Sequence, residues 1–277
     1  MASDHHLRAS PGSRVHDVTP ESAGWRYLSF AVVTLAEGET FEHAGDGREM
    51  AVVPLSGSLS VEAGTLTGSL ERDSVFTAQP TVLYATPGTP IALSATSTAT
   101  FAIGGAPAEG RYETRFIAPP EMRSEIRGGG AATRQVSHVL AHPIEAERLI
   151  LYEVHVPRGG WSGWPPHCHD GYEGSPYLEE AYYFRLDPGD GWAVHRNYRL
   201  DEPFDETFAV GDGDLVLVTK GFHSSVASPG HNMWFLNYLA GELLDDARKT
   251  LPFFQPEYRW IDGRWDEGAW ELPVVGR

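Results

Sequence analysis

Two histidines stand two residues apart in the short segment PPHCHD, as His167 and His169. On an extended strand, residues at i and i+2 face the same side, so both imidazoles are expected to point the same way. Eleven residues after this pair the chain offers the carboxylates of Glu179 and Glu180, and a further 43 residues on it offers His223. Three imidazoles and one carboxylate suit a borderline divalent metal ion, with coordination positions left free for a substrate.

The choice between the two neighbouring carboxylates depends on strand register. Alternation places Glu180 on one face with Tyr182, and Glu179 on the other face with Tyr183. A slip of one residue would exchange the faces, so the spacing leaves both glutamates open as the metal ligand. Cys168 lies between the two histidines on the opposite strand face and is predicted to be a small packing residue.

Composition narrows the class of protein. The chain of 277 residues has 21 Lys and Arg against 38 Asp and Glu, a formal charge of −17, which disfavours nucleic acid and anionic membranes as partners. One cysteine excludes an internal disulfide framework. No apolar run approaches the roughly 20 residues of a membrane span, and the polar start lacks a signal-peptide core, so a cytoplasmic protein is expected. No GxGxxG follows a strand pattern, so neither NAD nor a flavin is expected.

Short strands must position the candidate ligands. Runs of β-branched and aromatic residues, cut by Gly, Pro or Asp, predict strands. The predicted strands are Trp25–Leu35, Met50–Leu55, Thr81–Ala85, Ile91–Ala95, Leu149–Val156, Ala181–Leu186, Trp192–Tyr198 and Asp214–Thr219. The best helical candidate is Glu242–Thr250. Many short strands and few helices indicate an all-β protein built as a sandwich or barrel.

The second half of the chain repeats features of the first. Three segments match in order, with offsets between 123 and 133 residues, which predicts two similar β-barrels in tandem. The expected organisation is a polar N-terminal segment (1–22), an N-terminal barrel (23–120), a Gly-rich linker (121–135) and a C-terminal barrel with an extension (136–277).

The first copy is informative by what it lacks. Its counterpart of the histidine pair is the lone His43, Glu49 matches Glu180, and Pro90 stands where His223 falls in the second copy. The N-terminal barrel is therefore expected to hold no metal and to serve packing, assembly or a pocket wall.

The layout of two histidines, a glutamate and a later histidine on short strands resembles the cupins, whose jelly-roll barrels hold a metal on those four side chains. Two spacings depart from that pattern. Eleven residues separate His169 from Glu180, where cupins commonly have about five, and one residue rather than two separates Gly221 from His223.

These departures point to a narrower family. HCHDGYEGSPYLEEAYYFRLDPGDGWAVHRNY, FDETFAVGDGDLVLVTKGFHSSVASPG and MWFLNYLAG are similar to the 5-deoxy-glucuronate isomerase family of myo-inositol catabolism, as are GWRYLSFAVVTLAEGE and GREMAVVPLSGSLSVEAG. The resemblance covers residues 24–260 and implies two jelly-roll (cupin) barrels in tandem. It implies one divalent transition metal (Mn, Fe, Ni, Co or Zn) on His167, His169, Glu180 and His223. Related motifs place two aromatic residues after the ligand glutamate and its neighbour, which favours Glu180 over Glu179.

The resemblance also implies a reaction, the conversion of 5-deoxy-D-glucuronate, a small anionic sugar acid, to 5-dehydro-2-deoxy-D-gluconate. Moving a carbonyl to the neighbouring carbon requires a proton to be removed and returned, and a metal stabilises the enediolate charge. The predicted catalytic residues are Glu180, Tyr182 and Lys220. The base stays open between Tyr182, a metal-bound hydroxide and, for a slipped register, Glu179 or Tyr183.

The substrate carboxylate must be bound by local cations against the negative charge of the whole chain. Arg196, Lys220 and Arg185 are predicted to bind it, because arginine offers a bidentate fork and lysine a point charge. His155 and His195 lie on predicted strands. They are expected either to contact the metal-bound imidazoles or only to pack in the core.

Three other functions compete. They are a uronate ketol-isomerase acting on 4-deoxy-L-threo-5-hexosulose-uronate, an iron-dependent cupin dioxygenase, and a sugar-binding bicupin without activity. An intact ligand set in one barrel argues for an enzyme, although fold alone does not fix function. The sequence leaves the choice between monomer and homo-oligomer open.

Overall fold

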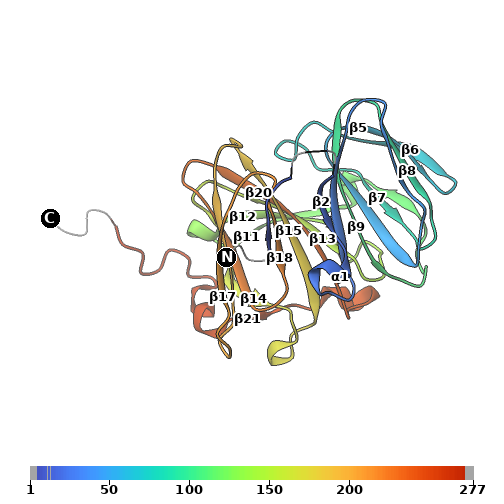
Figure 1. Cartoon of the computed structure of the whole chain (residues 1–277). Coiled ribbons are helices and arrows are strands. Elements are labelled where there is room, and N and C mark those ends of the chain that lie inside the picture. Colours follow the sequence, from blue (N-terminus) through green and yellow to red (C-terminus); the bar gives the residue numbers. More distant parts are fainter. Residues whose placement is uncertain (1–4, 11, 13, 272–277) are drawn as a thin grey trace.

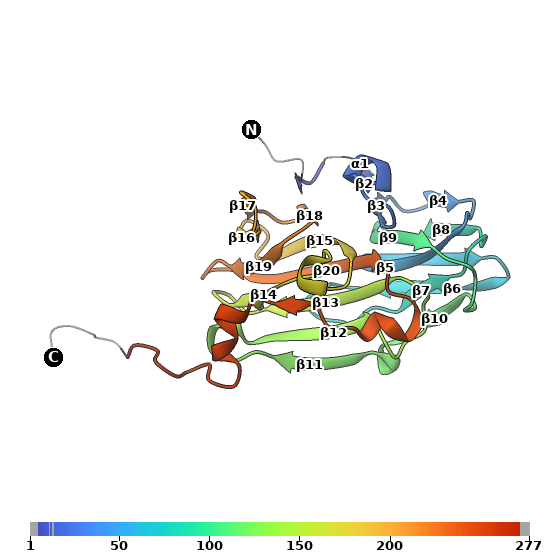
Figure 2. The same ribbon diagram turned by 90° about the horizontal axis from the view of Figure 1, so that it is seen from below.

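The computed structural model describes residues 5–10, 12 and 14–271 and consists mainly of β-strands gathered into two barrels (Figures 1 and 2). The N-terminal strands are β1 (His6–Leu7), β2 (Arg14–Val18), β3 (Ser29–Leu35), β4 (Thr40–His43), β5 (Arg48–Ala63), β6 (Leu66–Arg72), β7 (Val82–Ala85), β8 (Ile91–Ala95), β9 (Ala99–Pro107) and β10 (Arg115–Ile117). The C-terminal strands are β11 (Arg123–Arg127), β12 (Arg134–Leu140), β13 (Ile150–Val156), β14 (Trp161–Cys168), β15 (Leu178–Asp187), β16 (Ala193–Tyr198), β17 (Asp205–Val210), β18 (Leu215–Val218), β19 (Phe222–Ala227), β20 (Asn232–Gly241) and β21 (Phe253–Phe254). The short helices are α1 (Pro20–Ala23) and the 3-10 turns η1 (Pro119–Glu121), η2 (Gly130–Ala132), η3 (Tyr172–Gly174), η4 (Asp245–Lys249) and η5 (Pro256–Ile261).

The N-terminal barrel is built around the long strand β5. Its first part pairs with β7 and β9, and its second part pairs with β6 and β8, with a register shift between Pro54 and Ser56. One strand therefore takes part in both walls, and an apolar cluster that includes Val52, Leu59 and Phe101 fills the space between them. A bulge of this kind bends a strand and helps a sheet to close.

The C-terminal barrel consists of two sheets. One has the order β1-β18-β15-β20-β13-β12-β11, and the other has the order β17-β16-β19-β14-β21. Strand β15 shows why the sequence folds in this way: Tyr182 and Phe184 enter the core of this barrel, whereas Ala181 and Tyr183 belong to a different cluster on the opposite face. The alternation predicted for this strand is confirmed.

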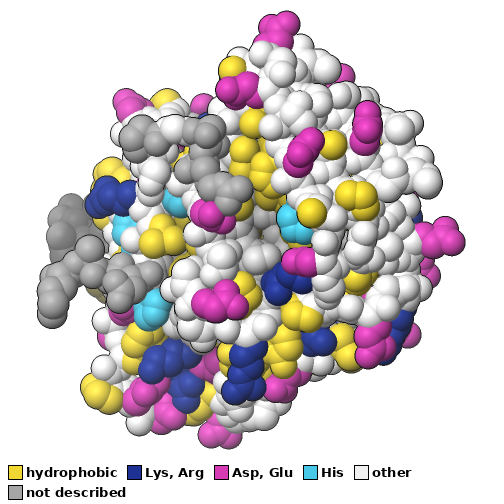
Figure 3. Space-filling model, turned by 45° about the vertical axis from the view of Figure 1, so that its right-hand side comes forward, with side chains coloured by type: hydrophobic (Ala, Val, Ile, Leu, Met, Phe, Trp, Pro, Cys, Tyr) yellow, Lys and Arg dark blue, Asp and Glu magenta, His cyan; other side chains and the backbone are white. Residues whose placement is uncertain are grey.

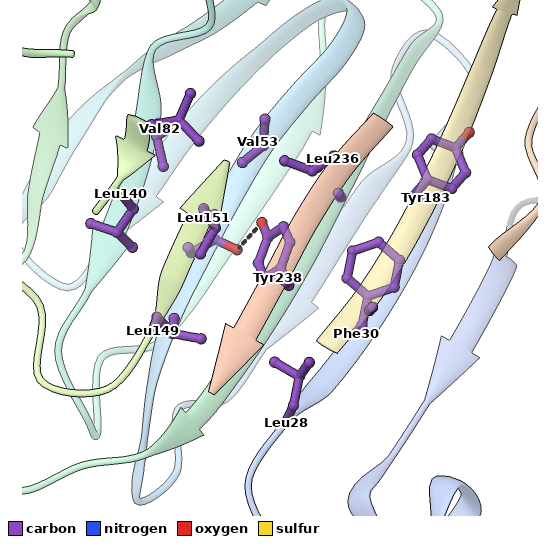
Figure 4. Packing of buried hydrophobic residues seen from close by; sticks show 14 of the residues in the cluster. Leu28, Phe30, Val53, Val82, Leu140, Leu149, Leu151, Tyr183, Leu236 and Tyr238 are labelled. Atoms are coloured by element: carbon purple, nitrogen blue, oxygen red, sulfur yellow. Dashed lines mark hydrogen bonds between the residues drawn. The ribbon is translucent and has the colours of Figure 1, made fainter. Parts of the chain in front are cut away.

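The two barrels pack face to face through one large apolar cluster. Figure 4 shows Phe30 and Val53 of the N-terminal barrel among Leu151, Tyr183 and Tyr238 of the C-terminal barrel. The buried hydroxyl of Tyr238 donates a hydrogen bond of 3.1 Å across this interface to the carbonyl oxygen of residue 51. Burial of apolar surface from both sheets is the main force that holds the barrels together.

Two buried glutamates join the barrels reciprocally. The carboxylate of Glu49 on β5 accepts three backbone N–H bonds from residues 147–149, just before β13, at 2.6 to 2.8 Å. The carboxylate of Glu179 on β15 accepts three from residues 26–28, just before β3, at 2.6 to 2.9 Å. Each barrel thus inserts one carboxylate into the backbone of the other.

This symmetry corrects the internal alignment predicted from the sequence. The structural equivalent of Glu49 is Glu179, so the match of Glu49 to Glu180 was wrong by one residue. Met50 occupies the position of Glu180 and packs in the core of the N-terminal barrel. The two segments can be aligned at either glutamate, and strand register decides between them.

Two further expectations differ from the structure. The predicted linker 121–135 contains β11, which pairs with β12 over five residues (Figure 2). The helix predicted at Glu242–Thr250 is instead the 3-10 turn η4. Asp245 has a φ of 51°, in the left-handed region, which interrupts an α-helix.

The exterior carries the negative charge expected from the composition. Asp and Glu side chains are scattered over the face in Figure 3, while Lys and Arg lie mostly in its lower half. Among the described residues, no helix combines the length and apolar character needed to cross a bilayer.

Candidate metal centre and pocket

Three histidines meet inside the C-terminal barrel. His167 on β14 is the register partner of His223 on β19, and His169 follows directly after β14. One ligand atom from each of the three residues lies within 4.8 Å of the others. The side chain of Cys168 points away from them and is buried among Tyr198 and Phe222, as expected of a packing residue.

Glu180 completes the cluster. Its Oε2 atom lies 2.8 Å from Nε2 of His169 and 3.3 Å from Nε2 of His223. The neighbouring Glu179 faces the other barrel and is held there by backbone N–H groups. The structure therefore brings Glu180, and not Glu179, to the histidines, because the register of β15 turns alternate residues to opposite faces.

Backbone groups orient two of the imidazoles. Nδ1 of His169 lies 2.9 Å from the carbonyl oxygen of Leu178, and Nδ1 of His223 lies 3.2 Å from that of Gly221. In each ring this leaves Nε2 for the centre of the cluster. Among the described residues, Nδ1 of His167 is buried without a hydrogen-bond partner, and Nε2 of His223 is buried with no hydrogen bond beyond its 3.3 Å contact with Glu180. Unpaired imidazole nitrogens beside a carboxylate are the donor set that a divalent transition metal accepts.

The charge states of His167 and Glu180 agree with this interpretation. Burial, together with the nearby His223 and His169, holds the pKa of His167 well below its usual value, so its imidazole is neutral. Burial opposes ionisation of Glu180, but the imidazoles of His169 and His223 outweigh it and hold the pKa of Glu180 below its usual range. A neutral imidazole and an ionised carboxylate are the ligand forms that bind metal.

A cavity of about 340 Å³ opens over this cluster. Its wall includes His167, His169 and Glu180. The rest of its wall is formed by apolar, amide and cationic side chains, among them Val136, Ile150, Tyr152, Val154, Leu178, Tyr182, Phe235, Asn237, Leu239, Arg127, Arg134, Arg248 and Lys249. Its size is in the range of small-molecule pockets.

A model of the KduI/IolB family matches residues 3–261. The chain belongs to the KduI/IolB family. It is 37% identical over 251 residues to a 5-deoxy-glucuronate isomerase of Geobacillus kaustophilus, covering 88% of this chain and 89% of that protein. It is 32% identical over 254 residues to a 5-deoxy-glucuronate isomerase of Bacillus subtilis, covering 89% and 92%. The predicted family and the predicted class of enzyme, an isomerase, are confirmed.

Solved structures confirm the fold. An IolB-like protein from Salmonella typhimurium superposes with a TM-score of 0.89 at 31% identity, over 94% of this chain and all of that one (100%). An oxalate decarboxylase from Lactobacillus farciminis superposes with a TM-score of 0.65 at 12% identity, over 95% of this chain and 91% of that one. The KduI/IolB family member described here thus has the predicted architecture of two cupin barrels in tandem.

The three cations predicted to bind substrate lie outside the pocket of this family member. Arg185 pairs with Asp212, Arg196 with Asp205, and Lys220 with Glu202, at 2.8, 2.6 and 2.7 Å. Strand alternation explains why Arg185 and Arg196 lie outside the pocket. Arg185 shares its face with Glu179, and Arg196 is exposed whereas its neighbours His195 and Asn197 are buried.

The two additional histidines take other partners. His195 is fully buried, with Nδ1 2.8 Å from Oγ of Ser225 and Nε2 2.7 Å from Oδ1 of Asn197. Burial and the nearby His223 lower the pKa of His195 to about 3, so this ring is neutral. Its ring stacks on that of His223 at a centroid distance of 6.3 Å. His155 reaches the other barrel, with Nε2 2.8 Å from the carbonyl oxygen of Val75.

The pocket also contains cations that the sequence reasoning missed. Arg127, Arg134, Arg248 and Lys249 line its wall. Arg127 and Arg134 fall in the segment read as a linker, and Arg248 and Lys249 in the segment read as a helix. Neither segment has a clean alternation of apolar and polar residues that could have assigned its faces.

Proposed function

We propose that this protein is a metal-dependent aldose–ketose isomerase that converts 5-deoxy-D-glucuronate to 5-dehydro-2-deoxy-D-gluconate. The observation that carries the proposal is the convergence of His167, His169, His223 and Glu180 beside a cavity of about 340 Å³, with three of the four in its wall. The names of the relatives at 31–37% identity support the substrate.

The four side chains would hold one divalent transition metal (Mn, Fe, Ni, Co or Zn). Such an ion would polarise the substrate carbonyl and stabilise negative charge on neighbouring oxygens, without a redox change. The orientation of His169 and His223 by backbone carbonyls supports this role, because a fixed tautomer keeps Nε2 free as a donor.

Tyr182 is the nearest candidate for handling a proton. Its ring lies against the ring of His223, with 5.7 Å between the centroids, and Asn237 on β20 is its partner in the strand register. Burial and the carboxylate of Glu180 raise the pKa of Tyr182 well above its usual value. The phenol therefore keeps its proton at neutral pH, which favours Tyr182 as a donor to a substrate oxygen and disfavours it as the base.

The N-terminal barrel, in this proposal, holds no metal. Glu49 is engaged by three backbone N–H groups of the other barrel, and Nδ1 of His43 accepts a bond from the N–H of Gly45 at 3.2 Å. Pro90 has no ligand atom. The role of the N-terminal barrel is to support the metal-binding barrel through the shared apolar interface.

Metal content and turnover, measured together, test the function. Purified protein is stripped with a chelator, reloaded with one metal at a time and assayed with 5-deoxy-D-glucuronate, with formation of the ketone followed by NMR. We expect no conversion after stripping, recovery on reloading, and loss of both metal and activity in His223→Ala. Conversion that survives complete metal removal, or no conversion with any of the five metals, would refute the proposal.

Two controls separate the competing functions. Turnover under argon with a non-redox metal excludes a dioxygenase, because that reaction consumes oxygen. A parallel assay with 4-deoxy-L-threo-5-hexosulose-uronate distinguishes the related ketol-isomerase by the ratio of kcat/KM for the two substrates. A sugar-binding protein would bind both compounds and convert neither.

A further inference from the structure

Two arginines face each other at the edge of the pocket. Arg127 ends β11 and Arg134 begins β12, and the two are register partners in this antiparallel pair. Both line the cavity that contains the histidine cluster. Like charges directly opposite on neighbouring strands destabilise a sheet, so this pair works against folding unless a negative charge offsets it.

Protein groups offset the charge of Arg127 but not that of Arg134. Arg127 forms an ion pair with Glu125 at 2.6 Å. Arg134 donates to the carbonyl oxygen of Ala132 at 3.0 Å, and among the described residues no carboxylate lies within ion-pair distance of it. Burial and the repulsion of Arg127 lower the pKa of Arg134 to about 10, so its guanidinium stays charged at neutral pH.

The remaining cations of the pocket are less suited to bind a ligand. The guanidinium of Arg248 is occupied by the backbone, with donors 2.8 Å from the carbonyl oxygen of Leu149 and 2.6 Å from that of Ile144. Lys249 is exposed. Arg134 is therefore the sheltered positive charge with hydrogen-bonding capacity to spare.

We propose that Arg134, supported by Arg127, binds the carboxylate of the sugar acid and so fixes the direction in which the substrate lies. The carboxylate end would lie at the edge formed by β11 and β12, with the aldehyde end at His167, His169 and His223. A guanidinium can bind a carboxylate with two parallel hydrogen bonds, which orients the ligand as well as attracting it. The identity of the ligand rests on the proposed function, whereas the anion site rests on the arginines themselves.

Steady-state kinetics of Arg134→Met, in the metal-loaded full chain, test the proposal. The substrates are 5-deoxy-D-glucuronate and its analogue with the carboxylate reduced to a hydroxymethyl group. We expect KM for the acid to rise on the order of 10- to 100-fold, with kcat and metal content nearly unchanged, because a charged hydrogen-bonding partner is lost. KM for the neutral analogue should not change. Arg134→Lys should recover part of the affinity for the acid.

Arg123→Met is the matched control, since Arg123 lies on the same strand β11, is exposed and is outside the pocket lining. An unchanged KM in Arg134→Met, or an equal rise for the neutral analogue, would overturn the proposal.

Calorimetry with glucuronate and glucose tests the anion site separately from the proposed function. If the wild type converts no substrate but binds glucuronate more tightly than glucose, and Arg134→Met abolishes that preference, the anion site stands and the isomerase proposal fails. If the wild type shows no preference for glucuronate, the anion site is refuted. Should Arg134→Met not fold, the same comparisons are made with Arg127→Met and Arg134→Lys.

Discussion

At the scale of single residues, two adjacent glutamates have unrelated tasks. Glu180 contacts the histidines at 2.8 and 3.3 Å, and Glu179 accepts three backbone N–H bonds from the other barrel. We expect Glu180→Gln to lose bound metal and to lower kcat/KM by more than the roughly 10- to 100-fold effect of removing an outer-shell partner. Metal analysis of the purified variant and the NMR assay measure both effects.

Glu179→Gln is the control at this scale. It changes the same functional group one position away and should keep its metal, even though the folded state becomes less stable. The assignment of Glu180 as a ligand fails if Glu180→Gln retains full metal, or if Glu179→Gln is the variant that loses it.

At the scale of strands, the equivalence of Glu49 and Glu179 makes a symmetric prediction. Each carboxylate accepts three N–H bonds from the segment that precedes a strand of the other barrel. An amide offers one acceptor oxygen and places an NH₂ group against backbone donors. We therefore expect Glu49→Gln and Glu179→Gln each to lower the free energy of unfolding by about 3 kcal/mol, because charge-assisted bonds are the strong ones. Denaturant titration measures this, and an effect of one variant alone would contradict the symmetry.

Strands also determine how much could be predicted from the sequence. In β15 the face that carries Tyr182 is apolar apart from Glu180, so the alternation of Tyr182 and Tyr183 could be predicted from the sequence. In β11 the sequence RSEIR carries one apolar residue, Ile126, and that side chain is 67% exposed. Such a strand forms because β12 offers it a backbone edge, which is a tertiary effect that no local pattern contains. Arg127 and Arg134 were missed for that reason.

At the scale of the whole molecule, a buried ion pair joins the barrels in addition to the apolar cluster. Both guanidinium NH groups of Arg72 on β6 contact the carboxylate of Glu153 on β13, at 2.6 and 2.8 Å, and neither side chain is exposed. The same guanidinium donates to the carbonyl oxygen of Ala78 within the N-terminal barrel. Because the pair crosses the interface, its loss should affect both barrels at once.

Arg72→Met would leave the charge of Glu153 buried without a partner. We expect this to lower the free energy of unfolding by about 3–5 kcal/mol. The double variant Arg72→Met, Glu153→Leu should recover most of that loss, since an apolar pair of similar volume avoids the cost of burying charge.

Unfolding of the wild type, followed by tryptophan fluorescence and by metal release, should show one shared transition, because the two barrels share one apolar cluster at their contact. Separate transitions, with metal retained after the first, would show instead that the metal-binding barrel folds alone and that the N-terminal barrel is dispensable for its stability.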